Sequence, residues 1–90
     1  MISPRFDKDP TSKEDYTWDW SVWLASGETI TAATFTAVGV TATTGTHDTT
    51  TATTRVGGGT VGAVGTITCH IVTSTGQEND WTFTFVIVEK

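Results

Sequence analysis

The chain has 90 residues, a formal net charge of −5 and only five lysine or arginine residues. Nucleic acids and anionic membranes are bound by clusters of cations, so this composition argues against both as partners. A chain of this length suffices for one small domain. Its single cysteine excludes an internal disulfide and is compatible with folding in a reducing cytoplasm.

Threonine is the commonest residue, at 22 of 90, and its branched β-carbon favours strands over helices. Nowhere do apolar residues recur with the helical period of about 3.6, so we expect an all-β protein. The N-terminal residues lack the apolar centre of a signal peptide. The chain also has no apolar run of about 18 residues that would predict a membrane span.

Residues 1–14 differ from the rest of the chain in composition. They hold six of the 15 formal charges and both prolines, which disfavour regular structure. We expect an extended arm here, either a frayed terminus or a segment ordered against a neighbouring subunit. In the second case Phe6 is the apolar anchor, and Arg5 and Lys8 lie in a polar rim. Deleting residues 1–12 is then expected to leave the melting temperature nearly unchanged.

The first predicted strand covers residues 15–20 and alternates strictly between two faces. Its apolar face carries Tyr16, Trp18 and Trp20. Residues 21–28 break the alternation, which suits a turn over one end of a sandwich, with Gly27 closing it.

Three more weakly patterned strands are expected in the middle of the chain. The first, residues 29–36, has its large apolar residues Ile30 and Phe35 at an odd spacing, which predicts a bulge between them. The next elements are a strand at 38–44, a turn at 45–48, a strand at 49–56 that contains Arg55, and a flexible glycine-rich connection at 57–62. We expect the threonine-rich strand at 49–56 to be an exposed edge that can accept a strand from a partner.

Two long strands at residues 66–73 and 81–88 are predicted to form a hairpin around a turn that contains Gly76. Each strand has one apolar face and one threonine-rich face. The apolar faces carry Ile67, Cys69 and Ile71 on the first strand and Trp81, Phe83, Phe85 and Ile87 on the second. A hairpin alone is marginally stable, so the earlier strands must supply a second layer.

Six to seven strands at spacings of about 8–12 residues are typical of a β-sandwich. Cys69 lies on the penultimate strand, where immunoglobulin domains carry the second cysteine of their inter-sheet bridge. We therefore predict one immunoglobulin-like or fibronectin-III-like sandwich of six to seven antiparallel strands over residues 15–90, preceded by the arm of residues 1–14.

The sequence does not predict catalytic chemistry, a metal site or a cofactor. Cys69 is expected to be buried and unreactive, and His70 points to the opposite face of the same strand. Two groups of acidic residues could supply oxygen ligands for a hard cation, but neither has a calcium-loop spacing. These groups are Asp7, Asp9 and Asp15, and Glu78 with Asp80. The glycines at 57–59 lack the lysine and the helix of a phosphate-binding loop.

Four tryptophans allow two interpretations. An exposed aromatic platform is typical of a carbohydrate-binding module, whereas a 90-residue sandwich with few large aliphatic residues needs aromatic side chains for its core. We expect Trp18, Trp20 and Trp81 in the core and Trp23, which falls outside the alternation, at the surface.

One set of segments extends over about residues 8–88. It consists of Lys8-Asp9-Pro10, residues 15–24 and 27–30, Thr50-Thr51-Ala52-Thr53, residues 58–62, and the hairpin segments 66–69 and 73–76 with Asp80. These segments resemble small tailed-bacteriophage virion proteins of the fibre–tail adaptor type. The resemblance implies a single immunoglobulin-like domain that is a non-enzymatic structural part of the virion.

The expected function is that of an adaptor that joins tail fibres to the tail. Capsid decoration and head–tail joining are the alternatives, followed by a carbohydrate-binding module that contacts the host surface. The expected partners are tail-ring, fibre or capsid subunits. We expect the chain to fold in the bacterial cytoplasm and to be present in many copies in a symmetric virion. The predicted interaction residues are Arg5, Phe6, Lys8, Trp23 and Arg55.

Overall fold

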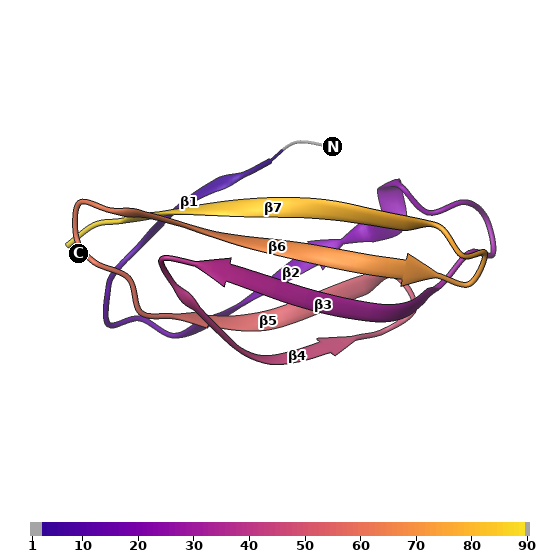
Figure 1. Ribbon diagram of the computed structural model, residues 1–90, viewed down its shortest axis with the longest axis horizontal. Helices are drawn as coiled ribbons and strands as arrows, with labels where there is room; N and C mark the ends of the chain where they lie inside the picture. Colours follow the sequence, from indigo (N-terminus) through magenta and orange to yellow (C-terminus); the bar gives the residue numbers. More distant parts are fainter. Residues whose placement is uncertain (1–2, 90) are drawn as a thin grey trace.

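The computed structural model describes residues 3–89, which form seven β-strands in two facing sheets (Figure 1). The strands are β1 (Arg5–Lys8), β2 (Glu14–Asp19), β3 (Ile30–Val38), β4 (Thr41–His47), β5 (Thr51–Gly57), β6 (Val64–Thr73) and β7 (Glu78–Ile87). The prediction of an all-β sandwich is confirmed. The molecule is elongated, with principal extents of 42 × 23 × 17 Å.

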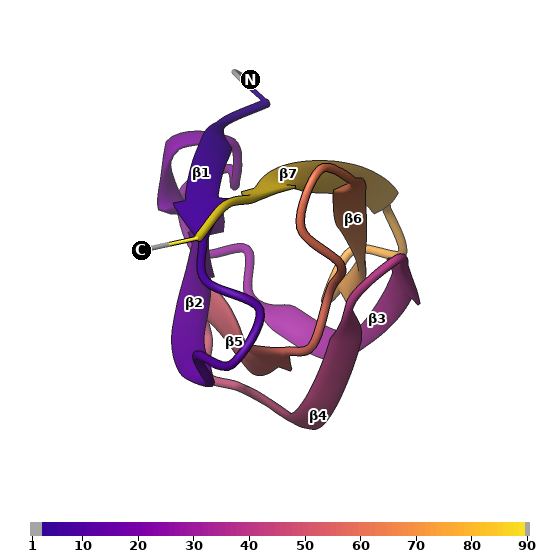
Figure 2. The ribbon, with the colours of Figure 1, turned by 90° about the vertical axis from the view of Figure 1, so that its left-hand side faces the viewer.

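One sheet has the strand order β1-β7-β6-β3, and the other has the order β2-β5-β4 (Figure 2). The predicted hairpin is present as β6 and β7, which pair antiparallel in the centre of the four-stranded sheet. The prediction of exclusively antiparallel strands is wrong for one pair, because β1 runs parallel to β7. Parallel neighbours need a long connection, and here almost the whole domain lies between them.

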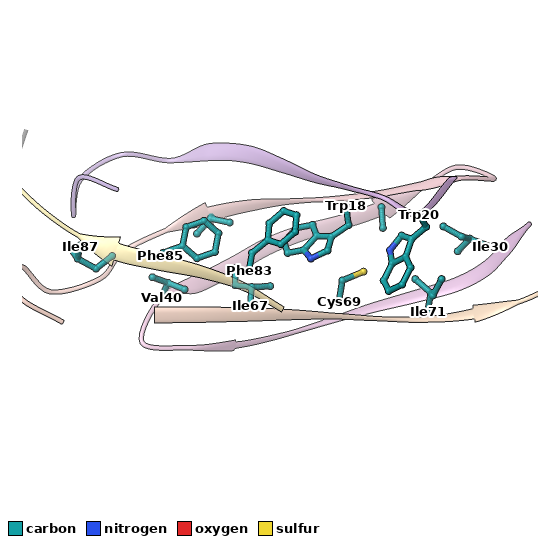
Figure 3. Close-up of a cluster of buried hydrophobic side chains, with 12 residues drawn as sticks. Trp18, Trp20, Ile30, Val40, Ile67, Cys69, Ile71, Phe83, Phe85 and Ile87 are labelled. Carbon is teal, nitrogen blue, oxygen red and sulfur yellow. The ribbon is translucent and has the colours of Figure 1, made fainter. Parts of the chain in front are cut away.

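Side chains from both sheets meet in one row along the long axis (Figure 3). The indole of Trp18 stacks on Phe83 with ring centroids 3.9 Å apart, and Trp18 Nε1 donates a hydrogen bond to the carbonyl oxygen of Trp81 at 3.0 Å. Trp18 and Trp20 are fully buried, and Trp81 is half-buried against Trp20. The prediction that these tryptophans belong to the core is confirmed for Trp18 and Trp20, whereas Trp81 is only partly buried and packs against the core.

The one helical element of the described residues is the 3-10 turn η1 (Trp20–Val22), which begins where β2 ends. Asp19 caps it, because its side chain accepts a hydrogen bond from the backbone N–H of Ser21 at 3.0 Å. Hydrogen bonding with the Ser21 side chain, and then with its backbone N–H, holds the pKa of Asp19 below its ordinary value. Residues 3–89 contain no helix long and apolar enough to cross a membrane.

Several predicted boundaries in the middle of the chain need correction. The predicted turn at 45–48 lies largely within β4, which continues to His47. The true turn follows at Asp48, whose carboxylate accepts from the N–H groups of Thr50 at 2.9 Å and Thr51 at 2.7 Å. The predicted bulge is present, since the pairing register of β3 with β6 shifts between Ile30 and Ala32.

The prediction that residues 49–56 form an exposed edge is wrong. This segment corresponds to β5, the central strand of its sheet, with β2 on one side and β4 on the other. Its inward side chains Ala52, Thr54 and Val56 are buried. A central strand has no free backbone groups for a partner, so strand addition at β5 is excluded.

Candidate interaction surfaces

The N-terminal segment is an edge strand of the sandwich over residues 5–8 and not a separate arm there. Phe6 is half-buried, and its ring lies 5.0 Å from Tyr16, 5.3 Å from Phe83 and 5.6 Å from Phe85, measured between centroids. The ring therefore already has an intramolecular site. Arg5, which points to the outer face, is exposed. Residues 1 and 2 of the predicted arm lie outside the described residues.

Lys8 is buried, with 2% of its surface exposed, and is not available as a contact residue. Its Nζ donates to the backbone carbonyl of Asp9 at 2.8 Å and to that of Gly58 at 2.6 Å. Burial lowers the pKa of the Lys8 ammonium, and nearby carboxylates partly offset this effect. Lys8 thus ties β1 to the connection between β5 and β6.

Trp23 lies at the end of the sandwich that carries η1 and the turn between β6 and β7 (Figure 1). Its ring meets that of Trp20 edge-on, with a centroid separation of 5.7 Å, and it is half-buried. Val22, beside it, is 79% exposed. Trp23, which was expected at the surface, is therefore only partly exposed. Val22 is the more exposed of the two apolar side chains.

Arg55 lies on the outer face of the three-stranded sheet. It faces its cross-strand neighbour Asp15, with Nε 2.9 Å and Nη2 3.4 Å from the two carboxylate oxygens. Both side chains are about half-exposed. The hydrogen bond to Asp15 raises the pKa of Arg55 above its ordinary value. The pair is a solvated cross-strand contact that leaves Arg55 accessible.

The five predicted interaction residues do not converge on one surface. Arg5, Phe6 and Lys8 share β1, Trp23 lies at one end, and Arg55 lies on the face of the other sheet. Residues 3–89 show neither a pocket nor a cluster of three metal-ligating side chains. Cys69 is fully buried, and burial raises the pKa of its thiol to about 11.

His70 stands between two carboxylates on the outer face of the four-stranded sheet. Its Nδ1 lies 2.6 Å from Asp80, and its Nε2 lies 2.8 Å from Glu78. Hydrogen bonding to Asp80, and then to Glu78, raises the pKa of His70. An imidazolium satisfies both carboxylates at once, because it donates from both nitrogens. The sequence placed His70 on the polar face but did not reveal these partners.

Glu28 joins two loops at the end of the sandwich that carries Trp23. Its buried carboxylate accepts from the N–H of Ala25 at 3.0 Å, from the hydroxyl of Thr73 at 2.7 Å and from the hydroxyl of Thr75. These bonds, that from Thr75 foremost, hold the pKa of Glu28 below its ordinary value. Glu28 therefore connects its own loop, which precedes β3, to the turn between β6 and β7.

Most of the chain matches one protein family. The sequence model of a family described as "Podophage GP4 fiber-tail adaptor protein gp77" matches residues 8–86, from the last residue of β1 into β7. The chain belongs to the Gp77 family. It is accordingly a structural tail component of the kind that joins fibres to the tail, and its location is the virion. A search of curated proteins gave no match.

Proposed function

We propose that this chain works as a rigid, non-enzymatic adaptor in which separate surfaces of one sandwich hold a tail protein and a fibre protein. Its membership of the Gp77 family carries this proposal. The elongated shape supports it, because 42 Å separate the two ends along the longest axis. Partners at such a distance from each other do not compete for the same side chains.

The first proposed contact is the end of the sandwich that carries Val22 and Trp23. Val22 is exposed on a short turn that Trp20 anchors in the core and Asp19 caps. The Glu28 hydrogen bonds fix the neighbouring loops. A rigid apolar protrusion loses little conformational entropy on binding, which favours it as an interface anchor.

The second proposed contact lies away from that end and is centred on Arg5 of β1, and Arg55, on the outer face of the other sheet, is a separate candidate. Both are exposed cations on a chain of net charge −5. Exposed charges of this kind contribute to partner selection more than to affinity. Phe6 and Lys8 support this region from inside, since they pack or bond within the chain.

We further propose that the sandwich is a variant of the immunoglobulin arrangement. Lettered A to G in chain order, the strands form one sheet B-E-D and a second sheet that contains G-F-C, as in immunoglobulin domains. The variation concerns the first strand, which pairs with the last strand instead of with the second.

A non-enzymatic role is supported by the surroundings of the chain's strongest potential nucleophile. Cys69 is fully buried and its thiol pKa is raised, whereas His70 lies on the opposite face with its nitrogens engaged. The net charge of −5 supports proteins, and not nucleic acid or membranes, as partners. The reduced buried cysteine is consistent with folding in the bacterial cytoplasm before incorporation into the virion in many copies.

The proposal is tested by reconstitution with purified fibre protein and with tails that lack fibres. We expect fibres to co-sediment with tails only when this chain is added. Val22→Asp is expected to abolish attachment to one of the two partners, whereas the control Thr60→Asp, on an exposed loop, retains both. Fibres that bind tails equally well without the chain would refute the adaptor function.

A further inference from the structure

The exposed large apolar side chains of residues 3–89 lie at the two ends of the sandwich. Val22 stands on η1 at one end, and Val38, Val61 and Val64 lie at the opposite end, where β3 ends and β6 begins (Figure 1). Val38 is 65% exposed and Val64 is 52% exposed. Single exposed apolar residues are common on proteins, whereas a contiguous group of them marks an interaction site.

Strand pairing joins two of these valines into a contiguous group on the outer face of the four-stranded sheet. Val64 of β6 lies directly opposite Val86 of β7, which is half-buried. Val38 of β3 lies opposite Thr66, the next outward residue of β6, so it is a diagonal neighbour of Val64. Three neighbouring strands thus present Val38, Val64 and Val86 together, and we call these residues the valine patch.

The valine patch is not an unfilled part of the core. Val40, two residues after Val38, is buried and closes the core at this end. It packs so closely on Gly65 that a β-carbon at that glycine would lie 2.6 Å from Val40 Cγ1.

The fold also does not require valine on this outer face. Farther along the face, the outward residues of β6 and β7 are threonines, namely Thr66, Thr68, Thr82 and Thr84. Threonine has the same branched shape and the same preference for strands as valine. The apolar side chains at this end therefore point to a contact outside the chain.

Charged side chains border the valine patch on the side of β1. Asp7 pairs with Val86 and Arg5 pairs with Thr84, and both charged residues are exposed. An apolar centre beside a polar rim is the usual arrangement of a protein interface. The valine patch is thus continuous with Arg5, on which the second proposed contact is centred.

We propose that the valine patch docks the chain on a tail protein through an apolar surface of that protein, and that the Val22 end holds the fibre. This inference rests on the proposed adaptor function, which requires two surfaces for two partners. The chain is a structural tail component, so its contact with the tail is a permanent one. Permanent interfaces are the more hydrophobic ones, and the valine patch has two exposed valines and a half-buried one, against one exposed valine at the other end.

Binding of the full-length chain to each partner tests this assignment. One probe is tails assembled without this chain and without fibres, and the other is purified fibre protein. The double variant Val38→Thr/Val64→Thr keeps the shape of both side chains but replaces one methyl group in each by a hydroxyl. We expect it to bind tails about tenfold more weakly, because an interface would bury both hydroxyls, and to bind fibres normally. Val22→Asp should show the reverse.

Val72→Thr is the matched control, because Val72 lies on the outer face of β6 at the other end of the strand. It should bind tails normally. Thermal denaturation checks that each variant is folded. The two single substitutions lie in different strands, so a folding defect in one leaves the other as the test.

The outcomes separate this inference from the adaptor function. Normal tail binding by the double variant, or a loss of fibre binding with tail binding intact, would overturn the assignment of the valine patch and leave the adaptor function in place. A chain that binds tails through the patch but recruits no fibres would refute the adaptor function and not this contact. A chain that does not bind tails at all would refute both.

Discussion

The indole of Trp18 lies flat on the ring of Phe83, with centroids 3.9 Å apart and an angle of 13° between the planes. Trp18 belongs to β2 and Phe83 to β7, so this stack joins the two sheets at the centre of the core. Phe35 packs against the indole from β3 and Phe6 against Phe83 from β1. Four strands from both sheets thus meet at one aromatic cluster.

Phe83→Ala is therefore expected to lower the free energy of unfolding by about 3–5 kcal/mol, through lost burial and the cavity that remains. A loss of this size is comparable to the whole stability of a small domain. Urea denaturation followed by tryptophan fluorescence measures it. Thr84→Ala, on the outer face of the same strand, should change the stability by less than about 0.5 kcal/mol. Equal losses in both variants would contradict the central role of the stack.

Lys8→Met keeps the length of the side chain but removes the donor to Gly58. We expect a loss of about 1–3 kcal/mol, because the part-buried carbonyl oxygen of Gly58 is left without its partner. Lys13→Met, at an exposed position of the same segment, should be nearly neutral. Thermal denaturation of both variants provides the measurement. If both substitutions were neutral, Lys8 would not hold β1 to the β5–β6 connection.

The sequence alone suggested that deletion of residues 1–12 would leave the melting temperature nearly unchanged. The structure predicts that this deletion lowers it. The deletion removes β1, the Phe6 ring and the Lys8 hydrogen bonds, and it exposes Tyr16 and Phe85. We expect a clearly lower melting temperature. Deleting only residues 1–3 is the matched control and should have little effect. An unchanged melting temperature for the longer deletion would mean that β1 contributes no stability.

His70 predicts a dependence of stability on pH near neutrality. Its folded pKa is raised above the ordinary value of 6.5 by Asp80 and Glu78. The stabilisation is therefore fully present below pH 6.5 and is lost as the pH rises through the folded pKa. Denaturant midpoints measured from pH 5 to pH 9 should fall across this window, and His70→Gln should flatten the profile. A wild-type profile that matches that of His70→Gln would show that the contacts of His70 with Asp80 and Glu78 do not contribute to stability.

Thr44, in β4, has a positive φ of 57°. Thr44→Gly should raise the stability of the domain by about 1 kcal/mol, because glycine adopts positive φ without a steric penalty. Thr46→Gly, in the same strand but at ordinary φ, should instead lower it by about 0.5–1 kcal/mol. The opposite signs distinguish local strain from a general effect of glycine in a strand. Destabilisation by both substitutions would contradict the strain assigned to Thr44.

The part of the fold that sequence predicts best is the β6–β7 hairpin, since both strands alternate strongly between apolar residues and threonine. The edge and central strands of the other sheet were not predictable in this way. β4 and β5 are both rich in threonine and alanine, and their order depends on long-range pairing.

Local sequence patterns also could not predict that the N-terminal segment forms a strand of the sandwich. Charges and prolines at residues 4–10 are typical of a solvated arm. Lys8 is nevertheless buried because it meets the carbonyl oxygen of Gly58, which lies 50 residues further along the chain. Phe6 similarly depends on rings contributed by β2 and β7. Only the assembled sandwich brings these groups together.

The adaptor function is the central claim, and the most direct measurement is the fibre content of virions assembled without this chain. Electron microscopy and gel analysis of purified particles provide it, with complementation by the intact chain as the control. We predict particles with complete heads and tails that lack fibres, and the return of fibres on complementation. Particles that retain a full set of fibres would contradict the claim. So would a copy number in normal virions close to that of the major capsid protein, because that ratio is expected of a shell-decorating protein.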